Sequence, residues 1–164
     1  MDKKRFVDRR ESRFLFSEPA DGDPVLIVCP RCSKMARVLP AGQQPVRGYA
    51  VKAICTHCWF SNTKADTKRS FHWHNDDPGD SYFNYGLWLK IACCNHVLWA
   101  FNLRHLDLLE DFVAAELREN PKDGMGYANS SIASRLPGWL KSAKNRKQIM
   151  ACIHKLRQMA HIET

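Results

Sequence analysis

Cys29-Pro30-Arg31-Cys32 and Cys55-Thr56-His57-Cys58 are the stretches of this sequence that decide the fold. Each Cys-x-x-Cys pair can direct two thiolates at one metal ion, and two pairs complete the tetrahedral S₄ cage typical of structural zinc sites. The usual template places about 15–20 residues between the pairs, and residues 33–54 form a slightly longer connection. We therefore predict one structural Zn²⁺, bound by Cys29, Cys32, Cys55 and Cys58. Four thiolates leave no open position for a catalytic water.

The residues around these pairs predict a β-hairpin. Residues 25–28 form a β-branched run before the first pair, and residues 35–39 leave it. Prolines and a glycine in 40–45 predict a turn, after which 48–54 return to the second pair. This arrangement resembles the zinc ribbon of transcription-factor type, which we expect over residues 25–66. Many zinc knuckles have glycine after the second cysteine, where φ is positive, whereas this chain has Ser33 and Trp59. We therefore expect less regular knuckles.

Length, charge and cysteine content limit the classes of protein. The chain has 164 residues, which fits one domain or a small metal-stapled lobe joined to a helical one. The formal net charge of +8 favours a polyanionic partner, namely nucleic acid or an acidic protein. The apolar-rich stretch 86–103 is interrupted by polar residues, so no membrane association is expected. The basic start is followed by no apolar core, so no secretory signal is expected. Without such a signal, the odd number of cysteines favours a reducing, cytoplasmic location.

Residues 1–24 predict a basic arm. Its lysines and arginines alternate with phenylalanines, a pattern that suits a phosphate backbone and unstacked bases. Prolines and a glycine in 19–24 end any regular structure. We expect a solvated, loosely docked terminus, because chain ends are commonly poorly ordered.

Residues 67–102 predict an aromatic connector followed by a second β-hairpin packed on the ribbon. The segments 86–93 and 96–101 are rich in aromatic and β-branched residues and flank Cys94-Asn95. The cysteines and histidines of this region suggest a second metal site, whereas adjacent cysteines on an extended segment point to opposite faces and favour a core role. The alternatives stay open for Cys93, Cys94 and His96, with His72 and His74.

Residues 103–164 predict a helical region, which makes the fold class α+β. Asn102 is a suitable N-cap for a helix over 103–118. A short helix is expected over 130–135 and a further helical turn after Pro137. Asn145 with Gln148 resembles a capping box at the start of a final helix.

Basic residues dominate the C-terminal part. Residues 124–162 contain seven lysines and arginines and no carboxylate. Three of them crowd the start of the final helix, where the helix dipole disfavours cations. A locally unfavourable arrangement often marks a site, so we predict an anion- or nucleic-acid-binding set of Lys144, Arg146, Lys147, Lys155 and Arg157.

A wider resemblance covers about four fifths of the chain. The stretch Cys93-Cys94-Asn95-His96-Val97-Leu98-Trp99, the motif Ser134-Arg135-Leu136-Pro137-Gly138-Trp139 and the two Cys-x-x-Cys pairs carry it. Together they resemble uncharacterised bacterial proteins with an N-terminal zinc ribbon and a C-terminal basic helical region. The resemblance implies a compact bacterial cytosolic protein and no particular activity.

Three hypotheses for function follow. The first is a non-enzymatic, zinc-stabilised nucleic-acid-binding protein that makes contact through the C-terminal basic helix and the N-terminal arm. The alternative is an adaptor or neutraliser that binds another protein through the ribbon and exposed aromatic side chains. A metal-dependent or thiol enzyme is the third. The sequence has no Walker glycine loop, no HExxH motif and no paired carboxylates for acid–base work, so no catalytic residue is assigned.

Overall fold

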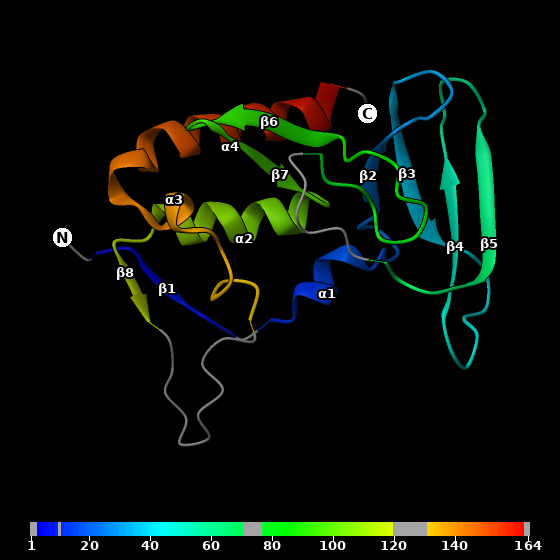
Figure 1. Ribbon diagram of the computed structural model, residues 1–164, viewed down its shortest axis with the longest axis horizontal. Coiled ribbons are helices and arrows are strands. Elements are labelled where there is room, and N and C mark those ends of the chain that lie inside the picture. The colour runs from blue at the N-terminus through cyan, green and yellow to red at the C-terminus, as the bar shows by residue number, and fades with distance from the viewer. Residues whose placement is uncertain (1–2, 10, 71–76, 120–130, 163–164) are drawn as a thin grey trace.

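The computed structural model describes residues 3–9, 11–70, 77–119 and 131–162, which form strands and helices in one mixed structure. An antiparallel sheet lies at one end of the molecule and the helices lie at the other (Figure 1). Strand hairpins occupy the N-terminal half and the longest helix ends the chain, so the predicted α+β class is confirmed.

The sheet at one end, here called the ribbon sheet, contains the predicted hairpin and two further strands. Its order is β2 (Val25–Val28), β3 (Met35–Pro40), β4 (Tyr49–Ile54) and β5 (Ser61–Thr67), all antiparallel. The hairpin of β3 and β4 was predicted from turn residues and alternation. Strand β5 was not predicted, because its sequence Ser-Asn-Thr-Lys-Ala-Asp-Thr has no apolar alternation.

The second predicted hairpin is also confirmed. It consists of β6 (Leu89–Cys93) and β7 (His96–Ala100). Cys94 and Asn95 form the two-residue turn with φ of +53° and +62°, which is typical of a type I′ turn. The backbone around this hairpin is joined to β2, because Leu26 N donates to Phe101 O at 2.8 Å and Leu26 O accepts from Trp88 N at 3.0 Å.

Helix α2 (Leu103–Ala114) begins at the predicted cap. The side-chain oxygen of Asn102 accepts from His105 N at 2.9 Å, and its amide nitrogen donates to Phe16 O at 3.0 Å. The helix ends at Ala114 and not at residue 118 as predicted. The next residues form strand β8 (Leu117–Glu119), which pairs in parallel with β1 (Arg5–Val7).

The described part of the N-terminal segment is docked, so the expectation of a loosely docked terminus is wrong there. Strand β1 pairs with β8, and α1 (Arg13–Ser17) follows it. Phe16 is 1% exposed, and the ring of Phe6 lies edge-on to Phe112 with centroids 5.2 Å apart. The aromatic residues of this segment are therefore used for packing.

The C-terminal part contains α3 (Gly138–Lys141), the 3₁₀ turn η1 (Ala143–Asn145) and α4 (Arg146–Ile162). The helical turn after Pro137 is confirmed, whereas residues 131–135 form turns and not the predicted short helix. Asn145 is not the cap of the last helix, because it already lies in η1 and its side chain donates to Trp139 O at 3.0 Å.

Two apolar clusters fill the described part of the structure. One contains the inner face of the ribbon sheet, with Val25, Ile27 and Val38 fully buried, together with Leu87 and Phe101. The other joins the second hairpin to α2 and α4 and includes Leu26 and Met35 from the ribbon sheet. Alternate residues of β2 therefore contribute to different clusters, and this strand connects the ribbon sheet to the helices.

His105 is the most deeply buried ionisable ring described. It is 3% exposed and stacks on Phe16, with ring centroids 5.1 Å apart. Its Nδ1 accepts from Phe101 N at 3.3 Å, which requires an unprotonated Nδ1. Burial lowers the pKa of His105 from 6.5 to about 3. The folded protein therefore excludes a proton that the unfolded chain binds below pH 6.5.

This difference predicts a pH-dependent stability with a defined sign. The contribution of His105 is fully present above pH 6.5 and is lost as the pH falls below it, since the unfolded state binds the proton. As the pH falls from about 7.5 to 5.5, the unfolding free energy of the wild type should decrease because the unfolded chain binds a proton at His105. His105→Phe lacks this group, so its decrease should be smaller by about 1.4 kcal/mol. Urea unfolding across this range measures the difference.

The exposed His154 provides the matched control. His154→Gln should keep the wild-type pH dependence. Parallel pH profiles for the wild type and His105→Phe would show that the buried ring is not the responsible group.

Candidate metal centre

Two similar loops present the four predicted cysteines. In the first, Cys29 follows β2, its N–H donates to Lys34 O at 2.8 Å, and its carbonyl accepts from Ser33 N at 2.9 Å. In the second, Cys55 follows β4, and its N–H donates to Phe60 O at 2.9 Å. The residue after each second cysteine has positive φ.

These φ values are +61° for Ser33 and +59° for Trp59, so the expectation of irregular knuckles is wrong. Two residues other than glycine adopt the left-handed conformation that the knuckle requires. Serine does so at modest cost, whereas a bulky residue in this region is a genuine outlier.

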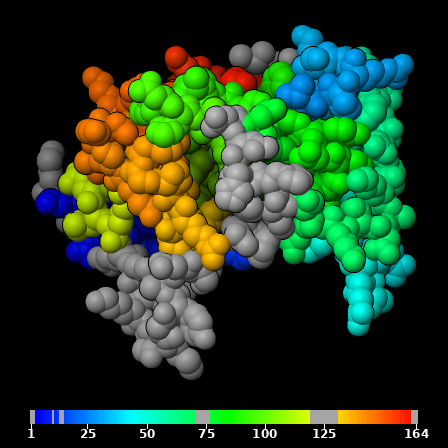
Figure 2. Space-filling view, in the orientation of Figure 1, coloured from blue at the N-terminus to red at the C-terminus, as the bar shows by residue number. Residues whose placement is uncertain are grey.

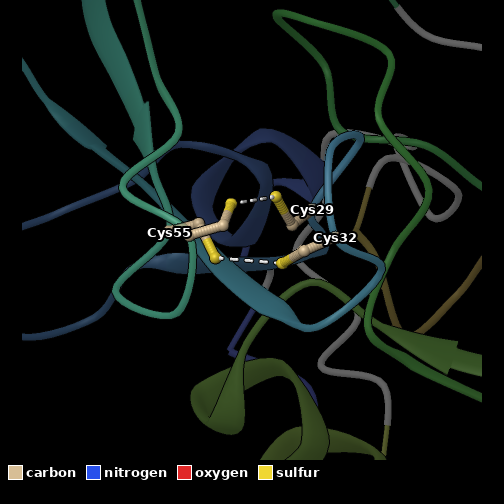
Figure 3. A group of neighbouring side chains, drawn as sticks. Cys29, Cys32 and Cys55 are labelled. Atoms are coloured by element: carbon tan, nitrogen blue, oxygen red, sulfur yellow. Dashed lines mark hydrogen bonds between the residues drawn. The ribbon is translucent and has the colours of Figure 1, made fainter.

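The four sulfur atoms face one another. Cys29 Sγ lies 3.6 Å from Cys58 Sγ, and Cys32 Sγ lies 3.6 Å from Cys55 Sγ. All four lie within 4.8 Å of one another, and Figure 3 shows Cys29 and Cys32 pointing toward Cys55 from the facing loop. A tetrahedron with metal–sulfur bonds of about 2.3 Å has edges of about 3.8 Å. The four cysteines are therefore close enough to hold one metal ion.

Backbone N–H groups around the cluster favour thiolates. Arg31 N donates to Cys29 Sγ at 3.4 Å. In the same way, the N–H of Lys34 donates to the Cys32 sulfur, and the N–H of Phe60 donates to the Cys58 sulfur. Burial opposes ionisation of Cys29, but the N–H groups and neighbouring thiols lower its pKa to about 7. The N–H of Lys34 favours the Cys32 thiolate, but burial and the neighbouring thiols raise its pKa to about 12. The N–H groups thus favour ionised sulfur at Cys29, and a bound cation would favour thiolates throughout the cluster.

The proposed second metal set is not assembled within the described residues. His72 and His74 lie outside them. Cys93 and Cys94 have sulfur atoms 3.8 Å apart, while the ring of His96 stacks on Trp139 with centroids 4.9 Å apart. Among residues whose positions are described, Cys29, Cys32, Cys55 and Cys58 are the one group of three or more close metal-ligating side chains. Burial raises the pKa of Cys93, as expected for a core thiol.

The predicted anion-binding residues are not gathered at one point. Lys144 lies in η1, and Arg146 and Lys147 begin α4. Lys155 and Arg157 lie about 12–17 Å further along that helix. Lys144, Lys147 and Lys155 are exposed. The two arginines are half-buried and contact other elements.

Both arginines connect α4 to α2 or to the residue that ends it. Arg157 Nη2 lies 2.7 Å from Asp107 Oδ1 and also pairs with Glu110. Arg146 Nη2 donates to Ala115 O at 3.0 Å, which places a cation at the carboxyl end of α2. The dipole of α2 favours a cation there, and this offsets the unfavourable position of Arg146 at the start of α4.

Sequence reasoning missed one feature of the ribbon. Residues 25–65 contain six lysines and arginines and no aspartate or glutamate. A local charge count finds this stretch from the sequence alone. The left-handed position of Trp59 can also be predicted from the sequence, once the knuckle is recognised. The chain matches no family model, and no curated protein or solved structure was found to be similar to it. The resemblance to bacterial zinc-ribbon proteins therefore remains a prediction.

The geometry predicts that every cysteine of the cluster is needed for metal binding. Cys32→Ser should reduce bound metal from about one ion per chain to near background, and should lower the unfolding free energy by about 3–5 kcal/mol. Metal analysis and urea unfolding of the purified protein measure these effects. Cys94→Ser is the matched control, because Cys94 is half-buried outside the cluster. A Cys32→Ser protein that keeps full metal content and stability would contradict the assignment.

Proposed function

We propose that this chain is a non-enzymatic, zinc-stabilised protein that binds nucleic acid. Zinc cross-links the two knuckles, and the exposed basic face of α4, together with the basic N-terminal segment, contacts phosphates. The observation that carries the proposal is the charge of α4, which contains lysines, arginines and histidines but no carboxylate. An ordinary solvated helix mixes acidic residues among its lysines to form pairs four residues apart.

Zinc is the metal that the donor set favours. Four thiolates in a tetrahedral arrangement suit Zn²⁺ or iron, and zinc in closed Cys₄ sites has a structural role. The distances between sulfur atoms support this fit. When bound, Zn²⁺ would supply charge for the thiolates and a cross-link between the end of β2 and the end of β4. The Cys₄ set has no free position for substrate, which supports a non-enzymatic role.

Elemental analysis of the protein, purified without added metal, tests the choice of metal. We expect about one zinc per chain and no more than traces of iron. A colourless protein is expected as well, because iron bound to four thiolates absorbs visible light. Stoichiometric iron would contradict the zinc assignment while leaving the Cys₄ site intact, and a metal-free, fully folded protein would contradict both.

Exposed lysines form the part of the surface that we assign to phosphate contact. Lys144, Lys147 and Lys155 are exposed, and Lys3 and Arg9 are exposed on the N-terminal segment. Arg146 and Arg157 are held by α2 and the residue after it, so we assign them to positioning the helix. Among the described residues, no helix has the length and apolar character of a membrane span.

Charge reversal tests this surface. Lys144→Glu with Lys147→Glu should weaken nucleic-acid binding and flatten its salt dependence by roughly one unit of slope for each lost phosphate contact. Folding should be unharmed, since anions suit the start of a helix. Fluorescence anisotropy with labelled DNA and RNA at several salt concentrations measures both quantities.

Lys68→Glu is the control for long-range charge, because Lys68 is exposed on the segment after β5. It should leave the salt slope nearly unchanged. Co-purification with and without nuclease completes the test. A protein partner that stays bound after nuclease treatment, with no measurable nucleic-acid binding, would contradict the proposal and support the adaptor hypothesis.

A further inference from the structure

Trp59 combines two features that are unfavourable for an isolated protein. Its side chain is 84% exposed, so the indole has little contact with the rest of the chain. Its φ is +59°, a conformation that glycine adopts freely and a bulky residue rarely does. Glycine would satisfy the knuckle at this position without strain or exposed apolar surface. A residue that breaks a local rule without a structural benefit indicates a functional role.

The ribbon segment that contains Trp59 is rich in positive charge. The cations of residues 25–65 are Arg31, Lys34, Arg37, Arg47, Lys52 and Lys64. A zinc ion with four thiolates carries a net charge of −2, which two of these cations offset. Arg31 lies closest in the described contacts, because its Nη1 donates to Cys58 O at 3.4 Å, next to the peptide bond that leads to Trp59. The first carboxylate after this stretch, Asp66, lies near the far end of β5, beside Gly48.

The register of the ribbon sheet places two further cations on one face. Arg37 is opposite Ile54, and Lys52 is opposite both Leu39 and Thr63. Residues opposite each other in antiparallel strands project to the same side. That side is the one away from the buried Val38. Its β2 and β3 part is covered, because Leu26, opposite Arg37, and Met35 are buried in the cluster with the helices. Arg37 is accordingly half-buried, whereas Lys52 on β4 is exposed. We call the exposed part of this side, with Lys52, together with the exposed Arg31 and Trp59 of the two knuckles, the outer ribbon face.

We propose that the outer ribbon face binds single-stranded nucleic acid, with an unpaired base stacked on Trp59 and phosphates near Arg31 and Lys52. Proteins that bind single strands combine a basic surface with exposed aromatic rings, whereas the bases of a duplex are already stacked on one another. This inference rests on the proposed function, namely nucleic-acid binding, and adds the strand type and the residue that contacts a base. It concerns a surface separate from α4, at the end of the molecule formed by the ribbon sheet (Figure 2).

Trp59→Gly tests the inference, because glycine suits the backbone and removes only the indole. Binding should be measured with labelled single strands of DNA and of RNA of about 20 nucleotides, which exceeds the usual site size, and with the matching duplex. We expect Trp59→Gly to weaken single-strand binding about tenfold, the loss expected for one stacked base, and to change duplex binding little. Quenching of tryptophan emission by the single strand should be lost, while the melting temperature and metal content stay the same or rise.

Val46→Ser is the matched control. Val46 is fully exposed in the turn between β3 and β4, at the opposite end of β4 from Trp59 and about 20 Å away along the strand. It removes exposed apolar surface without removing a ring, so single-strand binding should stay at the wild-type level.

The outcomes separate this inference from the proposed function. A wild-type protein that binds neither single strands nor duplex overturns both. Normal nucleic-acid binding that Trp59→Gly leaves unchanged overturns only the role of Trp59. A lower melting temperature with loss of metal in Trp59→Gly would assign the indole a structural role, and this also overturns the inference.

Discussion

Four cysteine sulfur atoms lie within 4.8 Å of one another, and the ribbon sheet depends on that constraint. Thiolates at this separation repel, so the arrangement is stable only with a bound cation or with retained protons. The cysteines join the end of β2 to the end of β4, two strands separated by β3. Strand β2 in turn contributes side chains to both apolar clusters and is bonded to the second hairpin through Leu26. A metal bound at the knuckles would therefore stabilise the junction with the helices as well as the sheet; Figure 1 shows β2 on the side of the sheet that faces the helices.

The basic residues of this chain have two different uses. Arg146 donates to the carbonyl oxygen of the residue that follows α2. Arg157 pairs with two carboxylates of α2. The lysines of η1 and α4 are exposed, and they form the surface to which we assign phosphate contacts. The positive charge of α4, which first indicated an anion site, is therefore used in part to hold α4 against α2. The ribbon, whose residues 25–65 contain six lysines and arginines and no carboxylate, also presents an exposed indole on a strained backbone.

Local signals in the sequence predicted the features that depend on neighbouring residues. Cysteine spacing predicted the metal cluster, and Asn102 predicted the start of α2. The aromatic and β-branched residues on either side of Cys94-Asn95 predicted the second hairpin. Long-range features left no such signal. The parallel pairing of β1 with β8 joins two three-residue strands more than a hundred residues apart. The polar strand β5 forms because β4 has a free edge, and Arg146 contacts α2 only after α4 has packed.

The most direct test of the central claim is X-ray absorption spectroscopy at the zinc edge of the purified protein. A closed structural centre predicts four sulfur neighbours at about 2.3 Å and no nitrogen or oxygen in the first shell. Fewer sulfur neighbours, or a bound water oxygen, would contradict a closed Cys₄ centre and would indicate an open, potentially catalytic metal site.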